Sequence, residues 1–293
     1  MNLDVVVCAK NRADALEKAL QQITREVPFR DLIVVYASSK DRTKEIAEKY
    51  TKKVFWDEDK GLGAARNLGM RKASSELVAM IDTDIILTKD WYKRLKKHFQ
   101  DPKVAAAMGT PIYGYGCLPI QRLSEYERWM GGTLWGCTNT IFKRDSVLEV
   151  GNFDETISGA GEDYDLFKRL LAAGYKWVWD KEVVVYHPMS LPEYFHHFAW
   201  WRGCTPLIRE LIVQVRNHSL FRIYCRFAYS ILKSFQEGVR LSLIVHPTML
   251  FYIPMLNVVK VRAQIKGLKK MLCSEGIHKK PNNPREDGGS TNI

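Results

Sequence analysis

Short apolar runs rich in β-branched residues alternate with amphipathic segments along this chain. The runs are Leu3–Cys8, Leu32–Tyr36, Leu77–Ile81 and Val183–Tyr186, and the helix-like segments include Arg12–Glu26 and Thr43–Tyr50. Strands that alternate with helices predict an α/β fold in which helices cover both faces of a mostly parallel sheet. Ligands bind such a sheet beyond the carboxyl ends of its strands, so the residues that follow each run are the candidates for chemistry.

The character of the sequence changes near Leu191, where aromatic and basic residues begin to interleave. We therefore expect a sheet-containing domain over residues 1–190 and a helical, aromatic and basic region over residues 191–273. Residues 274–293 are rich in Lys, Pro, Asn, Gly and Ser and are expected to be disordered. With 46% hydrophobic residues among 293, the chain can bury a core, which excludes a wholly disordered protein.

An uncharged stretch from Leu241 to Val259 lies inside the helical region. It is nearly long enough to cross a bilayer core, but Pro247 and Pro254 interrupt it. Each proline removes a backbone donor that lipid cannot replace, which favours an interfacial or re-entrant helix pair over a spanning helix. A buried amphipathic helical subdomain is the alternative interpretation.

Positive charge and scattered cysteines narrow the class of protein. Lys and Arg outnumber Asp and Glu by 44 to 33, which gives a formal charge of +11. That charge suits nucleic acid, phospholipid or a diphosphate ligand, and charge alone does not choose among them. The six cysteines include no Cys-x-x-Cys pair, so we expect reduced thiols and no zinc ribbon. The N-terminus has no basic segment followed by a long apolar segment, which predicts a cytoplasmic protein.

Two carboxylates, Asp82 and Asp84, directly follow the apolar run Leu77–Ile81. A pair separated by one residue at a strand end can share one hard divalent cation together with phosphate ligands. A departing nucleoside diphosphate develops negative charge, which bound Mg²⁺ or Mn²⁺ stabilises as a Lewis acid. A solvated turn is the alternative interpretation of the same residues.

Two further motifs flank this acidic pair. Upstream, the glycine-rich segment Lys60–Gly69 leads into a helix whose amides and cations could receive phosphate or ribose oxygens. Downstream, Glu162 and Asp163 begin a second helix, where a carboxylate could take a proton from an acceptor hydroxyl. Ordinary helix capping and dipole compensation explain both motifs equally well when each is taken alone.

The order of these motifs resembles the family-2 glycosyltransferases of the GT-A fold, from Leu3 to His187. The matching elements in chain order are Lys10-Asn11-Arg12 after the first strand, Arg66-Asn67 after the glycine-rich segment, the Asp-x-Asp of Asp82 and Asp84, Asn139 with Arg144 on the acceptor side, the Gly-x-Phe-Asp of Gly151 to Asp154, and the pair Glu162-Asp163.

This resemblance implies a GT-A-like, Rossmann-type mixed sheet and sugar transfer from a nucleotide sugar to an acceptor hydroxyl with inversion. It implies that Asp163, with Glu162 beside it, is the catalytic base. Asp84 would be the main ligand of Mn²⁺ or Mg²⁺, Asp82 a ribose or metal contact, and His187 a third metal ligand. The donor would be bound by Lys10, Asn11, Arg12, Arg66 and Asn67.

One departure from the family pattern concerns the nucleobase. After the second strand the family commonly has an Asp-Asp-x-Ser element, whereas this chain has Tyr36-Ala37-Ser38-Ser39-Lys40-Asp41. Tyr36 could stack on a base and Ser38 could bond its edge, since an aromatic face accepts any base. The choice between a UDP-linked and a GDP-linked donor therefore stays open.

The stretch His196 to Gly203 follows the last predicted strand closely, so it could form a lid or an acceptor wall. The adjacent His196 and His197 lack the i, i+4 spacing of a helical metal site, and we favour packing at a membrane interface. Basic residues nearby gain about 1 kcal/mol each from anionic lipid. We therefore expect a glycan or lipid-linked acceptor and a peripheral position on the cytoplasmic face of an anionic membrane, with an ordinary helical core as the alternative.

Two other classes of function compete. A basic nucleic-acid-binding protein fits the charge but leaves Asp82, Asp84 and Asp163 without a use. A metal-dependent nucleotidyltransferase would attack phosphorus, and it normally has a glycine-rich loop directly after the first strand, where this chain has Ala9 and Lys10. We therefore favour the glycosyltransferase and expect no nucleic-acid partner. The sequence does not indicate the donor sugar, the acceptor, the processivity or the oligomeric state.

Overall fold

The computed structural model describes residues 2–130, 136–157, 159–217 and 220–274. Its strands are β1 (Leu3–Ala9), β2 (Asp31–Tyr36), β3 (Lys53–Trp56), β4 (Leu77–Ile81), β5 (Ile86–Leu87), β6 (Val104–Tyr115), β7 (Asn139–Lys143) and β8 (Lys176–Pro188). Its helices are α1 (Ala13–Glu26), α2 (Thr43–Tyr50), α3 (Leu62–Lys72), α4 (Trp91–Lys96), the 3₁₀ helix η1 (Lys97–Gln100), α5 (Leu118–Met130), α6 (Arg144–Glu149), α7 (Glu162–Ala172), α8 (Leu191–Arg202), α9 (Thr205–Asn217), α10 (Leu220–Ile244) and α11 (Met249–Ser274).

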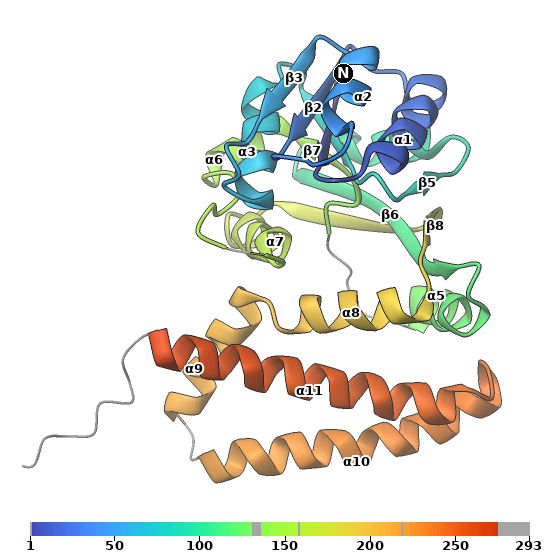
Figure 1. Ribbon diagram of the computed structural model, residues 1–293, viewed down its shortest axis with the longest axis vertical. Helices are drawn as coiled ribbons and strands as arrows, with labels where there is room; N and C mark the ends of the chain where they lie inside the picture. The colour runs from blue at the N-terminus through green and yellow to red at the C-terminus, as the bar shows by residue number, and fades with distance from the viewer. Residues whose placement is uncertain (1, 131–135, 158, 218–219, 275–293) are drawn as a thin grey trace, which may run out of the picture.

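The strands form one eight-stranded sheet in the order β3-β2-β1-β4-β7-β6-β8-β5. The first four run parallel, as predicted, and the carboxyl ends of β1, β2, β3 and β4 meet at one edge. Strand β7 is antiparallel to both β4 and β6, β8 is parallel to β6, and β5 is antiparallel to β8. The mixed α/β fold class expected from the resemblance is therefore confirmed (Figure 1).

Several strands were not predicted from the sequence. Strands β3, β5, β6 and β7 were not expected, and β8 begins at Lys176 although the apolar run predicted a strand only from Val183. Strand β6 is rich in Ala and Gly, which have little strand preference of their own. It is extended because it pairs with β7 on one side and β8 on the other, and neither contact can be read from local sequence.

Alternate residues of the sheet face two separate cores, as the period of two in a strand requires. Val5 and Val7 of β1 pack with Leu16 and Leu20 of α1 on one face. Val6 of β1 packs on the other face, in the cluster that contains residues of α3, α6 and α7. Burying each large aliphatic side chain contributes roughly 2 kcal/mol before the loss of conformational entropy. The helices therefore cover both faces and hold the strand ends in register.

The C-terminal helices lie together beyond one end of the sheet (Figure 1). Ser190 caps the start of helix α8. Its side chain accepts a hydrogen bond from the backbone N–H of Glu193, and the Glu193 side chain accepts one from the backbone N–H of Ser190, which fixes the first turn. A core that includes Ile120, Tyr194, Leu241 and Met249 joins α5, α8, α10 and α11. The helical region is therefore packed onto the sheet-containing part through α5.

Helices α10 and α11 meet at a turn that contains Pro247, inside the uncharged stretch Leu241–Val259, and both helices extend well beyond that stretch. The predicted interfacial or re-entrant position of the stretch stays a prediction. Gly238 of α10 lies against the start of α11, where an added Cβ would come 3.2 Å from the carbonyl oxygens of Met249 and Leu250. Pro254 lies inside α11. Among the described residues no helix has both the length and the apolar content to span a bilayer. The expected disordered tail lies outside the described residues, except for Ser274, which ends α11.

Candidate active site

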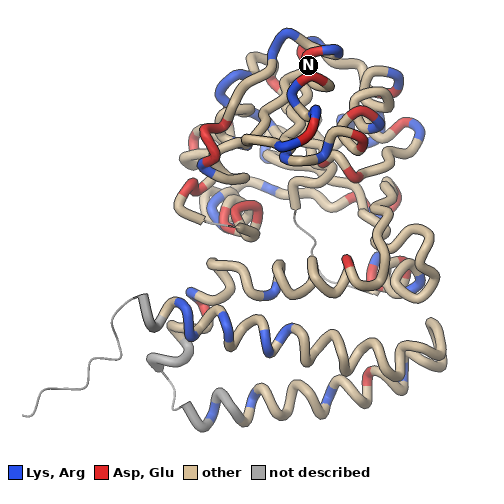
Figure 2. The backbone as a smooth tube through the Cα atoms, viewed as in Figure 1, with Lys and Arg blue, Asp and Glu red and all other residues tan. Residues whose placement is uncertain are grey.

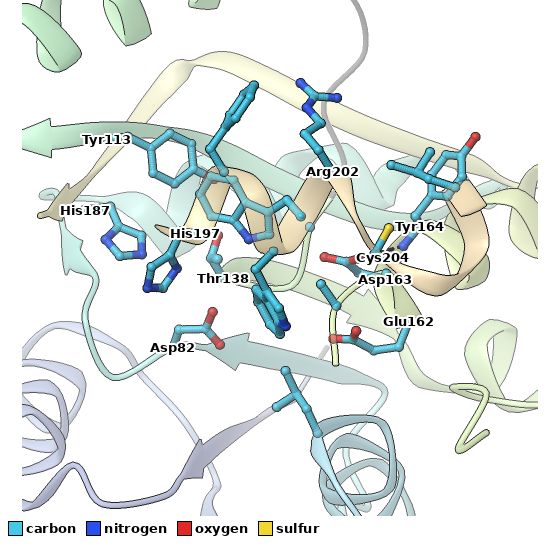
Figure 3. A pocket seen from close by; sticks show the side chains of 18 of the residues that line it. Asp82, Tyr113, Thr138, Glu162, Asp163, Tyr164, His187, His197, Arg202 and Cys204 are labelled. Carbon is cyan, nitrogen blue, oxygen red and sulfur yellow. Dashed lines mark hydrogen bonds between the residues drawn. The ribbon is translucent and has the colours of Figure 1, made fainter. Parts of the chain in front are cut away.

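A cavity of about 310 Å³ lies between the carboxyl edge of the sheet and helix α8. Figure 3 shows Asp82, His187 and His197 on one side of it and Glu162 and Asp163 on the other. The cavity is lined by Leu62, Arg66, Asp82, Asp84, Met108, Tyr113, Glu127, Gly136, Thr138, Ala160, Gly161, Glu162, Asp163, Tyr164, His187, Tyr194, His197, Phe198, Trp200, Trp201, Arg202, Cys204 and Leu207.

Asp84 and His187 meet at this cavity from distant parts of the chain. Asp84 follows β4 and His187 lies near the end of β8, and Oδ1 of Asp84 is 3.5 Å from Nε2 of His187. The other oxygen of Asp84 is 3.8 Å from a guanidinium nitrogen of Arg12, just after β1. Three residues singled out from the sequence therefore lie together.

Asp82 faces away from that pair toward Arg66, with 3.4 Å between Oδ1 and Nη2. Burial raises the pKa of Asp82, the positive charge of Arg66 opposes this rise, and the nearby Asp84 adds to it. The charge of Asp84 disfavours the charged form of Asp82, so a cation bound near both carboxylates would offset that repulsion.

The donor atoms suit a hard divalent ion, although the set is incomplete in the protein alone. Carboxylate oxygens with one imidazole match the preferences of Mn²⁺, and carboxylates match those of Mg²⁺. Across the part of the chain that the structure describes, no group of three or more His, Cys, Asp or Glu is arranged to hold a metal. Mg²⁺ commonly takes one or two carboxylates together with substrate phosphates and waters, and Asp84 would supply such a carboxylate.

Arg66 and Glu162 form a buried ion pair between α3 and α7. Arg66 is 5% exposed and Glu162 is 2% exposed, and their side chains are in contact through Nη1 and Oε1. Burial raises the pKa of Glu162 to about 7, against the opposing charge of Arg66. Because Arg66 engages Glu162 in this way, Glu162 is placed to hold the guanidinium, and its catalytic part beside Asp163 stays a prediction.

Asp163, the next residue, lines the cavity from the first turn of α7. Its Oδ1 accepts a hydrogen bond of 2.8 Å from the backbone of Tyr164, and the positive end of a helix dipole favours a carboxylate there. Gly161 makes the entry possible: its φ is +104°, and an added Cβ would come 2.8 Å from Pro206 and 3.0 Å from Cys204. The glycine therefore presents Asp163 to the cavity.

Asn67 and Asn139 have structural partners within the protein. Asn67 donates to the carbonyl oxygen of Phe153 at 2.8 Å and accepts from its amide at 2.7 Å, while it also donates to Glu155. Asn139 is fully buried and accepts from the backbone of Gly109. The amide of Asn67 fixes the loop at Phe153 and does not line the cavity, and its contact with the nucleotide stays a prediction.

The remaining donor residues lie on neighbouring loops and do not line the cavity. The backbone of Lys40 donates to Asn11 Oδ1 at 2.8 Å, which joins the loops after β1 and β2. Ser38 donates its hydroxyl proton to Asp59 Oδ2 at 2.5 Å, and Lys10 Nζ lies 3.8 Å from Asp59 Oδ1. Tyr36 ends β2 beside β3.

Asp59 is a residue that sequence reasoning missed. It places beside Ser38 a carboxylate that the family pattern would put directly after β2, and it comes instead from the loop after β3. The acidic run from Asp57 to Asp59, directly before the glycine-rich segment, is the signal that could have found it.

Helix α8 forms an aromatic wall of the cavity. The ring of His197 lies 5.7 Å from that of Trp201 and 6.3 Å from that of Trp200, and burial lowers the pKa of His197, as does the nearby His187. Arg202 stacks over Phe198, and Glu127 of α5 lines the same space. These side chains line the cavity, in line with the acceptor-wall alternative, and packing of this stretch at a membrane interface stays a prediction.

Comparison with known proteins agrees with this architecture. Residues 4–170 match the profile of the family described as Glycosyl transferase family 2. Glycosyltransferase AglE of Haloferax volcanii is 25% identical over 203 residues, which cover 64% of this chain and 66% of AglE. The poly-beta-1,6-N-acetyl-D-glucosamine synthase of Staphylococcus aureus is 26% identical over 201 residues, 62% of this chain and 47% of the synthase. This chain thus spans about two thirds and about half of these relatives.

Among solved structures, the mannosyltransferase PcManGT from Pyrobaculum calidifontis, in complex with GDP-Man and Mn²⁺, has a similar fold. Its TM-score is 0.64 at 17% identity, and the match covers 92% of this chain and 87% of PcManGT. The likeness extends beyond the sheet into the C-terminal helices, since it covers more than residues 1–190. The family profile, which spans more than half of the chain, settles the assignment: this chain belongs to glycosyl transferase family 2.

Proposed function

We propose that this protein transfers a sugar from a nucleoside-diphosphate sugar to an acceptor hydroxyl, with inversion at the anomeric carbon. The observation that carries the proposal is one cavity in which Asp163 lies opposite the pair Asp84 and His187, with Arg66 also in its lining. A carboxylate on one side and a cation-binding, cationic edge on the other are what a displacement at a sugar diphosphate requires. The chain's relatives are named as glycosyltransferases, which supports the same class.

The reaction is a single displacement. The acceptor oxygen forms a bond to the anomeric carbon while the bond from that carbon to the diphosphate oxygen breaks, and its electron pair leaves with the nucleoside diphosphate. Asp163 accepts the proton of the acceptor hydroxyl. Arg66, which is charged at every pH a protein encounters, lies where the leaving diphosphate gains charge, and Glu162 keeps it there. One displacement inverts the configuration.

The metal ligands in this proposal are Asp84 and His187, with Asp82 as a ribose or further metal contact. A bound Mn²⁺ or Mg²⁺ would supply Lewis acidity toward the diphosphate. The 3.5 Å approach of Asp84 to His187 and the electrostatic effect of Asp84 on Asp82 support this assignment. Solved structures with a similar fold hold Mn²⁺ with their nucleotide sugars, as in PcManGT.

Donor and acceptor would enter from different sides. The linked loops that carry Lys10, Ser38 and Asp59 lie at the carboxyl edge of β1, β2 and β3, where a nucleoside would lie in this fold. The rings of Trp200 and Trp201 form the opposite wall and present apolar faces to the acceptor. Such a wall suits the C–H face of a sugar as well as an apolar chain, so the acceptor class includes glycans and lipid-linked sugars.

The test is a panel of UDP-, GDP- and other nucleotide sugars with Mn²⁺ or Mg²⁺, scored by release of nucleoside diphosphate in the presence of glycan and lipid extracts. Asp163→Asn should lower kcat about a thousandfold while donor affinity, measured by calorimetry, stays the same. Asp165→Asn is the matched control, because Asp165 lies on the same helix and pairs with Arg169 outside the cavity.

Either of two results would contradict the proposal. Release of pyrophosphate with a nucleotidyl product would indicate a nucleotidyltransferase, and a product that retains the donor's anomeric configuration would exclude a single displacement. Full activity of Asp163→Asn would remove this residue from the role of base.

A further inference from the structure

The positive charge of this protein is concentrated in one part of the fold. Residues 205–274, which contain α9, α10 and α11, hold eleven Lys and Arg and two Glu. Residues 1–204 hold thirty basic and twenty-eight acidic residues, so the part with the active site is nearly neutral. Nearly all of the net charge of +11 therefore belongs to the helical layer farthest from the sheet, as Figure 2 makes visible.

The turn between α10 and α11 exposes large apolar side chains next to this charge. Leu243 is 82% exposed and Phe251 is 73% exposed, and Ile244, Leu250 and Met255 are exposed beside them. We call these five residues the hairpin tip. No charged residue occurs between 241 and 259. Isolated apolar residues are normal on a surface, but a contiguous exposed group marks an interaction site.

Charge and apolar surface share the same face of α11. The exposed residues Phe251, Met255 and Val258 are followed at helical spacing by Arg262, Lys266 and Lys269, so one stripe is apolar near the tip and basic toward the other end. Helix α10 runs antiparallel beside it, with Leu243 at the tip and Arg222, Arg226 and Lys233 at the basic end. Arg240, the cation nearest the tip, is held by Glu237 and Tyr126.

We propose that the α10–α11 hairpin seats this protein on an anionic lipid bilayer. The hairpin tip enters the boundary between headgroups and acyl chains, and the basic ends of both helices rest on phosphate headgroups. Helices with an apolar portion, Lys and Arg beside it and few acidic residues bind membranes in this interfacial manner. This binding to the bilayer does not depend on the reaction proposed above.

Charge complementarity favours lipid over the other occupants. A second copy that covered the same face would bring two strongly basic surfaces together, because a twofold contact buries the same patch on both subunits. A nucleic acid would neutralise the basic end but leave Leu243 and Phe251 in water. An anionic bilayer offers phosphate and hydrocarbon side by side, in the arrangement that the hairpin presents.

The α10–α11 hairpin also lies close to the active site. Helix α11 packs against α8, where an added Cβ at Gly203 would come 3.4 Å from the side chain of Ala263. Helix α8 carries Trp200 and Trp201 of the cavity wall. One helix therefore separates the proposed lipid-facing layer from the cavity.

The experiment is flotation of the full chain with vesicles of phosphatidylcholine alone and of phosphatidylcholine mixed with phosphatidylglycerol. Wild type should bind the anionic vesicles at least tenfold more tightly, and added salt should weaken that binding. Leu243→Ser with Phe251→Ser should weaken binding at least tenfold, whereas Leu171→Ser, an exposed leucine on α7, should not. Lys266→Glu with Lys269→Glu should weaken anionic binding roughly twentyfold or more, since each basic residue contributes roughly fivefold, and Lys18→Glu with Lys52→Glu serves as its control.

Circular dichroism must show each variant folded as wild type, and all of the substituted residues are exposed, so folding should be retained. The proposal is overturned if wild type does not float or if the tip and charge variants float as wild type does. It is also overturned if wild type ignores vesicles but forms a dimer that the tip variant dissociates, or binds duplex DNA in a charge-dependent way. Flotation uses no donor or acceptor, so failure of the proposed reaction would leave this result standing.

Discussion

At the scale of single residues, Asp4 is a buried charged residue with definite structural partners. Asp4 of β1 is fully buried, yet its carboxylate accepts from the amides of Ser74 and Ser75 at 2.7 and 2.9 Å and from the Ser75 hydroxyl at 2.6 Å. Burial works to raise the pKa of Asp4, but these hydrogen bonds outweigh it and the pKa lies below its ordinary value. The residue therefore ties β1 to the start of β4, which carries the Asp82–Asp84 pair at its other end.

Asp4→Ala should lower the free energy of unfolding by about 3 kcal/mol, because two amides and a hydroxyl lose a charged partner. A carboxyl whose folded pKa is depressed stabilises above its unfolded pKa of about 3.9 and loses that contribution as pH falls below it. Urea unfolding at neutral and acid pH would measure both effects. The difference between wild type and Asp4→Asn should shrink in acid, and a difference that does not change with pH would contradict this account.

The pKa shift of Glu162 is opposite in sign to that of Asp4. Its pKa is raised to about 7 in the folded protein, so the native state keeps a proton that the unfolded chain releases above about 4.5. Stability should therefore decline as pH rises from about 4.5 to about 7. Glu162→Gln, which is neutral throughout, should remove this decline. Denaturant unfolding of metal-free protein across that range is the measurement, and equal slopes for both proteins would show that Glu162 is ionised well below pH 7.

At the scale of elements, close packing of α3 on β1 positions Arg66. Gly69 is the contact point: an added Cβ would come 2.3 Å from Val6 Cγ1, which no real side chain tolerates. Because α3 lies this close to the sheet, its first turns reach the cavity and bring Arg66 to Asp82 and Glu162. Sequence alone presents Gly69 as one of several glycines in a loop-and-helix motif.

Gly69→Ala should destabilise the protein by roughly 2 kcal/mol, since overpacking displaces the helix or distorts Val6. The double variant Gly69→Ala with Val6→Ala removes the clash and should recover part of that loss. Thermal unfolding of the two variants and of Val6→Ala alone completes the cycle. If the two substitutions add without interaction, the contact between Gly69 and Val6 does not limit the approach of α3.

At the scale of the whole molecule, the mixed sheet brings together candidate site residues that lie far apart in the sequence. The parallel half supplies Asp82 and Asp84 after β4, while β8, more than ninety residues later, supplies His187. Helix α8 then closes the cavity from the C-terminal side. Binding of nucleotide and metal should therefore stabilise the whole fold and not only one loop.

Mn²⁺ with the matching nucleoside diphosphate should raise the Tm by roughly 5 °C at a hundredfold excess over Kd, and EDTA should abolish the rise. Asp84→Asn should lose the part of the shift that depends on metal, because Asp84 is the proposed ligand. Asp14→Asn, at an exposed acid of α1, is the control and should behave as wild type. A full shift for Asp84→Asn would remove Asp84 from the metal site.

The sequence alone determined three of the four parallel strands, β1, β2 and β4, and the order of the chemical motifs. Apolar runs such as Leu77–Ile81 carry strong local signals, because a short continuous apolar run bounded by polar residues is typical of a strand buried on both faces. Asp84 and Asp163 were recognisable because each stands directly at the end of such a signal, after a strand or at the first turn of a helix. Near Leu241–Val259 the prolines gave a mixed signal, since Pro247 lies in the turn between α10 and α11, whereas Pro254, expected to interrupt the stretch, lies inside α11.

Tertiary structure decided what depends on partners far along the chain. Strand β6 exists because β7 and β8 pair with it, Asn67 bonds to the backbone of Phe153, and Asp59 contacts Ser38 from another loop. The sequence could not distinguish whether the aromatic residues of α8 contact lipid or line a cavity. The hydrophobic effect is non-directional, so only the fold determines which surface these residues cover. Local preference is encoded residue by residue, whereas which side chains share a cavity depends on chain topology.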